Sequence, residues 1–377
     1  MLHARVTRND NQGPYLDSSR HRRSRFCPTW LLSFLLVLAF SAPAQEPKGN
    51  CQHSPQLFNN PQALEVTLRL PWQTIVTDEF FYQGGYPSRI EFIDDQGRPV
   101  SVALETERRG MSRQVICRYP PIKLRFDKDK VTGTLFQGQG TLKLVTHCDK
   151  GSVFEQYQVL EALAYSMYNL ITDFSFRVRP LSVTYIDTET GKRDGPRFAF
   201  LVEDDSEVAR RNGQKKLKIA TLTPERMDPR EASNLSLFQF MIGNTAWSLQ
   251  SDPDAKECCD NLKLIGQDPE KDPIYAIPND FDLSQFVNAH YAKPRGSLDI
   301  DSAPERLFQG SCIHNPALTD ARQRFLDREK AIRSLITNES RLLEESKKSA
   351  TDFLDGFFKM LRDRGQFDEN ITASCRH

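Results

Sequence analysis

The stretch Leu64-Glu65-Val66-Thr67-Leu68-Arg69-Leu70 decides the fold class of this 377-residue chain. Its apolar and polar side chains alternate, which is the period of a half-buried β-strand. Short strands with similar patterns follow, and Asp-Asp-Gln-Gly at residues 94–97 is typical of a hairpin turn. Residues 63–147 are therefore expected to form an antiparallel β-rich region. Later strands are predicted at residues 89–93, 100–104, 122–126, 141–145, 181–186 and 198–202.

Helical periodicity dominates the second half of the chain. Helices are predicted over residues 152–170 and 233–242, and two amphipathic helices over 318–364. Short strands are predicted at 262–265 and 274–277. The expected fold class is α+β. The expected parts are a signal peptide at 1–44, a polar leader at 45–62, a β-rich N-terminal lobe at 63–205, a C-terminal lobe at 206–317 and a helical tail at 318–377.

The N-terminus has the order of a secretory signal. Basic residues 20–25 precede an apolar run at 30–40, and the small residues at 41–44 favour cleavage after Ala44. The apolar run is shorter than the roughly 20 residues that span a bilayer, so a retained anchor is the weaker alternative. We expect an exported protein, periplasmic or secreted, without a transmembrane segment after cleavage.

Seven cysteines remain after cleavage at Ala44, and export predicts that some of them form disulfides. The odd number leaves at least one without a partner inside the chain. The adjacent Cys258 and Cys259 lack the two-residue spacing that zinc sites favour, so metal binding by cysteine is not expected. The seven are Cys51, Cys117, Cys148, Cys258, Cys259, Cys312 and Cys375.

The overall charge gives no reason to expect nucleic acid or an anionic membrane as a partner. The chain contains 50 basic and 50 acidic residues, and its 38% of apolar residues is ordinary for a globular protein. It has no Gly-x-Ser-x-Gly elbow, no His-Glu-x-x-His and no Walker loop. A secreted hydrolase is therefore only a third hypothesis.

An ordered series of polar residues indicates phosphoryl transfer. Lys143 lies on a predicted strand, Glu155 and Glu161 lie on the next helix, and Asn261 and Asp280 flank the two short strands. A lysine for phosphates, a helix glutamate to hold it, and an Asn and an Asp to hold magnesium form the order that a kinase-type site requires. The simpler interpretation is that the Asn and Asp are turn residues and the lysine faces solvent.

Several motifs in residues 64–290 resemble the spore coat protein H (CotH-like) family of secreted atypical protein kinases. They are Arg109-Gly110-Met111-Ser112-Arg113, the lysine-bearing strand at 122–126, Gly243-Asn244-Thr245-Ala246, Asn261 and Asp280-Phe281-Asp282. The resemblance implies a two-lobed atypical protein-kinase-like fold. It also implies ATP and magnesium as cofactors, and a secreted or surface protein as substrate.

The resemblance assigns roles to individual residues. Asn261 and Asp280 would hold magnesium, and either Lys143 or Lys123 would meet the phosphates. Glu203 would lie at an adenine-binding linker. Together with Glu155 or Glu161, these side chains are expected to converge in a cleft between the two lobes.

Ala246 departs from the family pattern because it stands where the catalytic Asp is expected. Alanine cannot accept a proton, and base catalysis typically contributes 10²–10⁴-fold to rate. Asp252 and Asp254 are nearby acids, but their spacing does not match the pattern. A weak phosphotransferase and a nucleotide-binding pseudokinase therefore both stay open.

Two motif residues also have ordinary structural interpretations. Asn244 after Gly243 is typical of a helix C-terminus, and Trp247 is typical of a core anchor. The alternative function is accordingly a non-catalytic envelope-associated or secreted binding or structural protein without nucleotide. ATP is scarce in a periplasm, which favours either a phosphate donor other than ATP or a role without catalysis.

Overall fold

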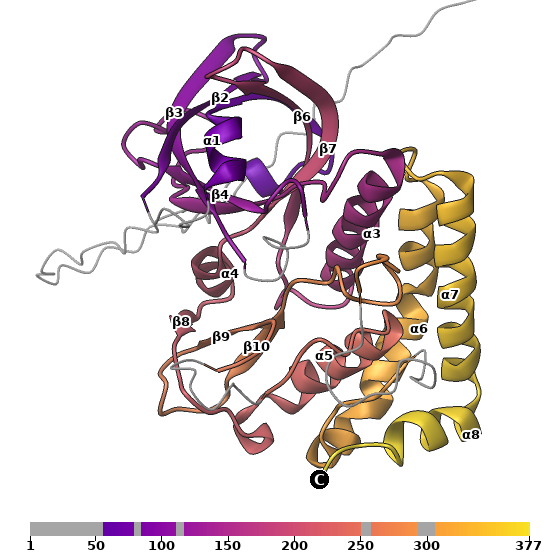
Figure 1. Ribbon diagram of the computed structural model, residues 1–377. Helices are drawn as coiled ribbons and strands as arrows, with labels where there is room; N and C mark the ends of the chain where they lie inside the picture. Colours follow the sequence, from indigo (N-terminus) through magenta and orange to yellow (C-terminus); the bar gives the residue numbers. More distant parts are fainter. Residues whose placement is uncertain (1–55, 79–83, 111–116, 250–257, 293–305) are drawn as a thin grey trace, which may run out of the picture. The chain divides into compact units, whose positions relative to one another are not determined.

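The computed structural model describes residues 56–78, 84–110, 117–249, 258–292 and 306–377 (Figure 1). The predicted signal peptide and most of the polar leader lie outside these residues. Contacts group the chain from Gln52 to His377 into one compact unit, which contains every described residue. In the described part of the chain, no helix combines the length and apolar character needed to cross a membrane.

The N-terminal part of the described chain is a closed barrel of seven strands in the order β1-β2-β3-β4-β5-β7-β6. Each strand that we predicted in this region is present, and several extend beyond the predicted limits. Gly97, with φ of 76°, closes the predicted hairpin: its N–H donates a hydrogen bond to the Asp94 carbonyl at 2.9 Å. The strands are β1 (Leu64–Leu70), β2 (Tyr86–Ile93), β3 (Pro99–Arg108), β4 (Ile122–Phe126), β5 (Thr141–Val145), β6 (Val178–Asp187) and β7 (Arg193–Val202).

A parallel pairing between β1 and β6 closes the barrel, from Leu64 opposite Leu181 to Leu70 opposite Asp187. All other neighbouring strands in the barrel are antiparallel. The predicted two-lobed kinase-like fold is therefore wrong: the molecule is a barrel-containing α+β fold. The error arose because alternation within a strand shows which face is buried but not which distant strand becomes its neighbour.

The chain also forms a short helix beside the barrel and a second, three-stranded sheet. Helix α1 (Trp72–Thr77) contacts β6, and Trp72 stacks on Tyr119 with ring centroids 5.4 Å apart. The second sheet has the order β10-β9-β8 and is antiparallel. Its strands are β8 (Lys215–Leu217), β9 (Leu262–Gly266) and β10 (Tyr275–Pro278). Strand β8 lies in the basic segment at residues 210–218, where no strand was predicted.

The remaining helices share one apolar core with the outer face of the barrel. Phe198, Phe200 and Val202 of β7 belong to this core, whereas Ala199 and Leu201 point into the barrel interior. The helical tail contributes to the same core through Phe325, Phe357 and other side chains, so it is not a separate extension. The main helices are α3 (Ser152–Asn169), α4 (Asp205–Arg211), α5 (Pro229–Met241), α6 (Asn315–Thr337) and α7 (Glu344–Arg362).

The prediction that cysteines pair is confirmed within the described residues. Cys117 lies 2.05 Å from Cys148, and Cys312 lies 2.02 Å from Cys375, measured between sulfur atoms. Their Cα atoms are 4.6 and 5.0 Å apart, within the ordinary disulfide range. The sulfur atoms of the adjacent Cys258 and Cys259 are also in contact. Cys51 lies outside the described residues.

Candidate functional site

Lys123 and Lys143 lie side by side on the outer face of the barrel. They are opposite each other in the β4–β5 ladder, and Lys143 is also opposite Val202 of β7. The residues on either side of each lysine are buried in the barrel interior, which the strand period requires. Val202 belongs to the core shared with the helices, so Lys143 is the lysine nearer to that core.

Asn261 and Asp280 lie at the same end of the β9–β10 hairpin. Leu262 and Pro278 are the last opposed pair, and beyond them the N–H of Asn279 donates to the Asn261 carbonyl at 3.0 Å. Asn261 has φ of 52° and Asp280 has φ of 66°, both in the left-handed region. The hairpin thus brings together the two residues that we predicted as metal ligands.

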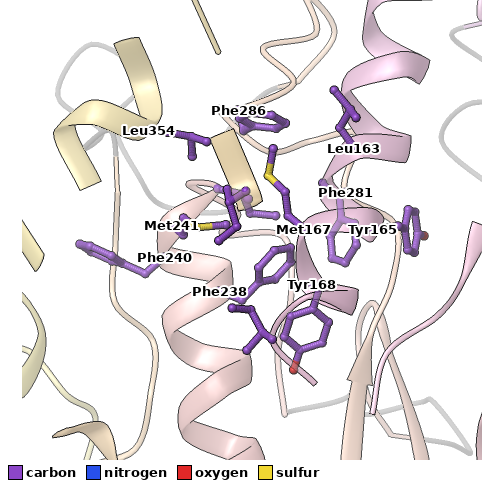
Figure 2. Close-up of a cluster of buried hydrophobic side chains, with 14 of the residues drawn as sticks. Leu163, Tyr165, Met167, Tyr168, Phe238, Phe240, Met241, Phe281, Phe286 and Leu354 are labelled. Atoms are coloured by element: carbon purple, nitrogen blue, oxygen red, sulfur yellow. The ribbon is translucent and has the colours of Figure 1, made fainter. Parts of the chain in front are cut away.

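Tyr165 and Phe281 attach this hairpin end to helix α3. The N–H of Asp280 donates to the Tyr165 hydroxyl at 2.8 Å. Phe281, fully buried, packs on Tyr165 with ring centroids 4.5 Å apart and on Phe238 of α5 at 5.4 Å. Figure 2 shows these rings gathered in the core between α3 and α5. Tyr165 also contacts Phe200 of β7 at 5.9 Å, so the hairpin end is connected to the barrel through one tyrosine.

The electrostatics of Lys143 reflect this position. The pKa of Lys143 is lowered to about 8, first by burial and then by the charges of Arg109 and Lys263. The carboxylates of Asp280 and Asp205 act in the opposite direction. The same region affects Tyr165, whose pKa is raised well above its usual value by burial and then by the nearby Glu161 and Asp280 charges. Lys143, Asp280 and Tyr165 therefore belong to one electrostatic neighbourhood.

The two candidate helix glutamates have different positions. Glu155 accepts a hydrogen bond from the N–H of Phe198 at 2.7 Å, so it attaches the start of α3 to β7. Glu161 is almost fully buried one helical turn before Tyr165, and its charge acts on the Tyr165 hydroxyl. Among the described residues, Lys143 forms no ion pair with either glutamate. The lysine–glutamate pairing expected from the sequence is therefore not formed in this structure.

Glu203 has its carboxylate engaged by protein groups. Its side chain accepts from the Arg211 guanidinium at 3.2 Å and from the N–H of Arg177 at 3.1 Å, and its own N–H donates to the Arg177 carbonyl at 2.9 Å. The Arg211 and Glu203 side chains are only 9% and 2% exposed. Glu203 lies between β7 and α4, and these contacts give its carboxylate a structural role.

Ala246, at the expected position of the catalytic base, is in direct contact with Asn261. The Asn261 amide group donates to the Ala246 carbonyl at 2.6 Å, and the N–H of Ala246 donates to Asn244 Oδ1 at 3.0 Å. Gly243, with φ of 62°, directly follows Ile242, the C-cap residue of α5, so the motif also forms a helix C-terminus. Trp247 is buried in the core of the small sheet.

The donor set fits a hard cation only in part. Because the Asn261 amide nitrogen donates to Ala246, its Oδ1 is the atom available as a ligand, and Asp280 adds a carboxylate. Magnesium needs few protein oxygens, since it keeps several waters or binds phosphate oxygens. No group of three or more histidine, cysteine, aspartate or glutamate side chains is placed to hold a metal in the described part of the chain.

Some predicted residues lie outside the described segments, and some important ones were missed. Asp252, Asp254 and the Met111-Ser112-Arg113 part of the first motif lie outside. Tyr165 and Lys263 were not predicted. Tyr165 lies within the predicted helix at 152–170, and Lys263 lies within the predicted strand at 262–265. Helical and strand periods indicate only which face of an element is buried, so they did not single out either residue.

A scan against protein-family models and a search of the curated proteins found no match for this chain. The CotH-like resemblance thus stays a prediction that rests on the motifs quoted above.

Proposed function

We propose that this chain is an exported protein that binds a magnesium–nucleotide complex. Lys143 contacts the phosphates, and Asn261 Oδ1 with the Asp280 carboxylate binds the metal ion. The observation that carries the proposal is the meeting of Asn261 and Asp280 at one hairpin end, in the electrostatic neighbourhood of a partly buried lysine. One lysine, one amide oxygen and one carboxylate are the groups that hold phosphate and Mg²⁺ in kinase-type sites.

Lys143 supports this role better than Lys123 does. Asp280 acts electrostatically on Lys143, and Lys143 is the lysine next to the helical core. Export is supported by the three cysteine pairs, because disulfides persist in oxidising compartments. We place the protein in the periplasm or outside the cell, with a secreted or surface protein as substrate if it is catalytic.

One observation favours the alternative of a binding or structural protein without nucleotide. The Glu203 carboxylate, assigned to an adenine linker, is already bound by Arg211 and Arg177. Backbone groups near Glu203 would have to recognise the base in its place. Thermal unfolding with and without ligand separates the two functions.

The purified protein should unfold at higher temperature in the presence of magnesium and ATP. Binding to the folded state alone stabilises by about 2.7 kcal/mol at one hundred times the dissociation constant. Asp280→Ala and Lys143→Met should each abolish this increase in unfolding temperature. Lys123→Met should retain it, and its loss in that variant would show that Lys123 binds the phosphates instead. The absence of a shift in the wild type at millimolar nucleotide would favour the alternative function.

The Ala246→Asp variant tests whether the protein is a weak phosphotransferase or a pseudokinase. Ala246→Asp introduces a carboxylate next to Asn261, where a base would be required. A gain in phosphate transfer to protein would support the pseudokinase version. A folded, ATP-binding Ala246→Asp variant without gain would remove position 246 from the catalytic argument.

A further inference from the structure

Arg109 lies on the same barrel face as the two candidate lysines. Its N–H donates to the Pro121 carbonyl at 2.9 Å, which continues the β3–β4 ladder by one residue. Glu107, two residues earlier, is opposite Lys123, and Lys123 is opposite Lys143. Residues two apart on a strand share a face, so Arg109 faces outward as Glu107 does, next to Lys123 and Lys143. Its Nε is buried and has no hydrogen-bond partner among the described residues.

Lys263 approaches from the hairpin. It is opposite Ile277 in the β9–β10 ladder, and it is two residues from Asn261. The strand period places Lys263 on the same hairpin face as Ile265, and opposed residues of a ladder share a face, so Ile277 is on it too. Ile265 and Ile277 belong to the core that also contains Val202, the residue opposite Lys143. The neighbouring Leu262 and Leu264 point to the opposite side, into the core of the small sheet. Lys263 is thus a cation on the hairpin face that is turned toward the core next to Lys143.

The charges of Arg109 and Lys263 converge on Lys143. Both act on it more strongly than the opposing Asp280 and Asp205 carboxylates do. Asp205 is moreover engaged by Lys216, at 2.8 Å. Like charges that are partly removed from water destabilise one another, and a bound anion relieves this repulsion.

We propose that Arg109, Lys143 and Lys263 form a three-cation site for the phosphate chain of the ligand, which therefore binds as a polyphosphate even without a metal ion. This inference rests on the proposed function and specifies its ligand class: compounds with three linked phosphates. The base and sugar of a nucleotide then contribute less to affinity than the phosphate chain does. Such a site would also accept an inorganic polyphosphate, a donor that does not depend on ATP.

Calorimetric titration of the purified protein with inorganic tripolyphosphate in EDTA tests the inference. Wild-type protein should bind it, and Lys263→Met and Arg109→Met should each weaken binding roughly tenfold, since each removes one charge-assisted contact. Lys215→Met is the matched control, because Lys215 is exposed on the adjacent strand β8, and it should bind as wild type does. Affinity should fall as pH rises through 8, where Lys143 loses its proton.

The outcomes separate this inference from the function on which it rests. If Mg–ATP binds but neither tripolyphosphate nor ATP binds in EDTA, the three-cation site is refuted while the nucleotide function stands. Wild-type affinity in both Lys263→Met and Arg109→Met would refute it in the same way. If no phosphate compound binds with or without magnesium, the proposed function fails as well. Circular dichroism of each variant confirms that it is folded.

Discussion

Asn261 and Asp280 adopt a backbone conformation that residues other than glycine seldom adopt. Asn and Asp tolerate the left-handed region better than most residues, so neither position demands glycine, yet both pay some strain. Strained residues cluster at functional sites, although a turn also uses Asn and Asp in this way. The two oxygen-bearing side chains at one hairpin end therefore fit both metal binding and plain turn formation, which the ligand titrations distinguish.

His147 is a buried residue whose chemistry the proposed site does not use. It is 1% exposed and packs against Tyr119 with ring centroids 4.4 Å apart, and neither ring nitrogen has a hydrogen-bond partner in the described structure. Its pKa is lowered to about 4, first by burial and then by the charge of Arg197, and the charges of Asp194 and Asp149 oppose this shift. His147 is thus a core histidine whose ring nitrogens are not hydrogen-bonded within the described residues.

We predict that His147 makes the protein sensitive to acid. Its folded pKa is below the unfolded value of about 6.5, so its contribution is complete above pH 6.5 and is lost as pH falls toward 4. Between pH 7.5 and pH 4.5, the protonation of His147 should lower the free energy of unfolding by about 2–3 kcal/mol. Urea unfolding at both pH values measures it, with His147→Phe as the variant that lacks the titration. An equal loss in wild type and variant would show that other groups cause it.

At the scale of elements, helix α4 is connected to the barrel by a buried ion pair. Arg211, at the end of α4, contacts Glu203 at the end of β7, and it also donates to the carbonyls of Asp173 and Ser175. Asp204 begins the helix by accepting from the N–H of Ser206 at 3.0 Å. The acidic segment that we interpreted as an adenine linker is thus also a helix start and a structural anchor.

Arg211→Met should strongly destabilise the protein. The change leaves the nearly buried Glu203 carboxylate without its cation, and breaking such a pair typically costs about 3–5 kcal/mol. Adding Glu203→Gln removes the buried charge and should recover part of the loss. Urea unfolding of wild type, single and double variants gives the values. A single variant as stable as wild type would mean that the pair contributes nothing and that Glu203 is available for a ligand.

At the scale of the whole molecule, the C-terminus is attached to the helical core. The N–H of Cys312 donates to the Arg376 carbonyl at 2.9 Å, the N–H of Arg376 donates to the Gly310 carbonyl at 2.8 Å, and Cys375 is bonded to Cys312. Between these ends, α6 and α7 pack into the core that also contains Phe238 and Phe281. The tail therefore supports the core on which the candidate hairpin end rests.

The Cys312→Ser/Cys375→Ser double variant should lose about 4 kcal/mol of stability, the chain-entropy value for a loop of this size. The Cys312–Cys375 bond joins residues 63 apart in sequence, and it closes the longest loop of the three cysteine pairs in the described residues. Urea unfolding without reductant measures the loss. The matched control is wild type with reductant, which should lose at least as much because every disulfide opens. Equal stability of variant and oxidised wild type would show that this bond does not form in solution.

The sequence by itself determined the elements and part of the site. Alternation and helical periodicity located the strands from Leu64 to Val202, the helix that carries Glu161, and the two short strands that Asn261 and Asp280 flank. These patterns are local, because they depend only on which side of each element is buried. Cysteine pairing was also predictable, but not the partner of each cysteine.

Only the tertiary structure decided how those elements meet. The parallel β1–β6 pairing closes the barrel between segments more than one hundred residues apart, and nothing in either strand specifies that partner. The same holds for Tyr165, whose hydroxyl meets Asp280, and for Arg109 and Lys263, whose charges act on Lys143. A sequence records which side chains are buried, whereas long-range pairing depends on the packing of the whole chain, and that packing assembles the candidate site.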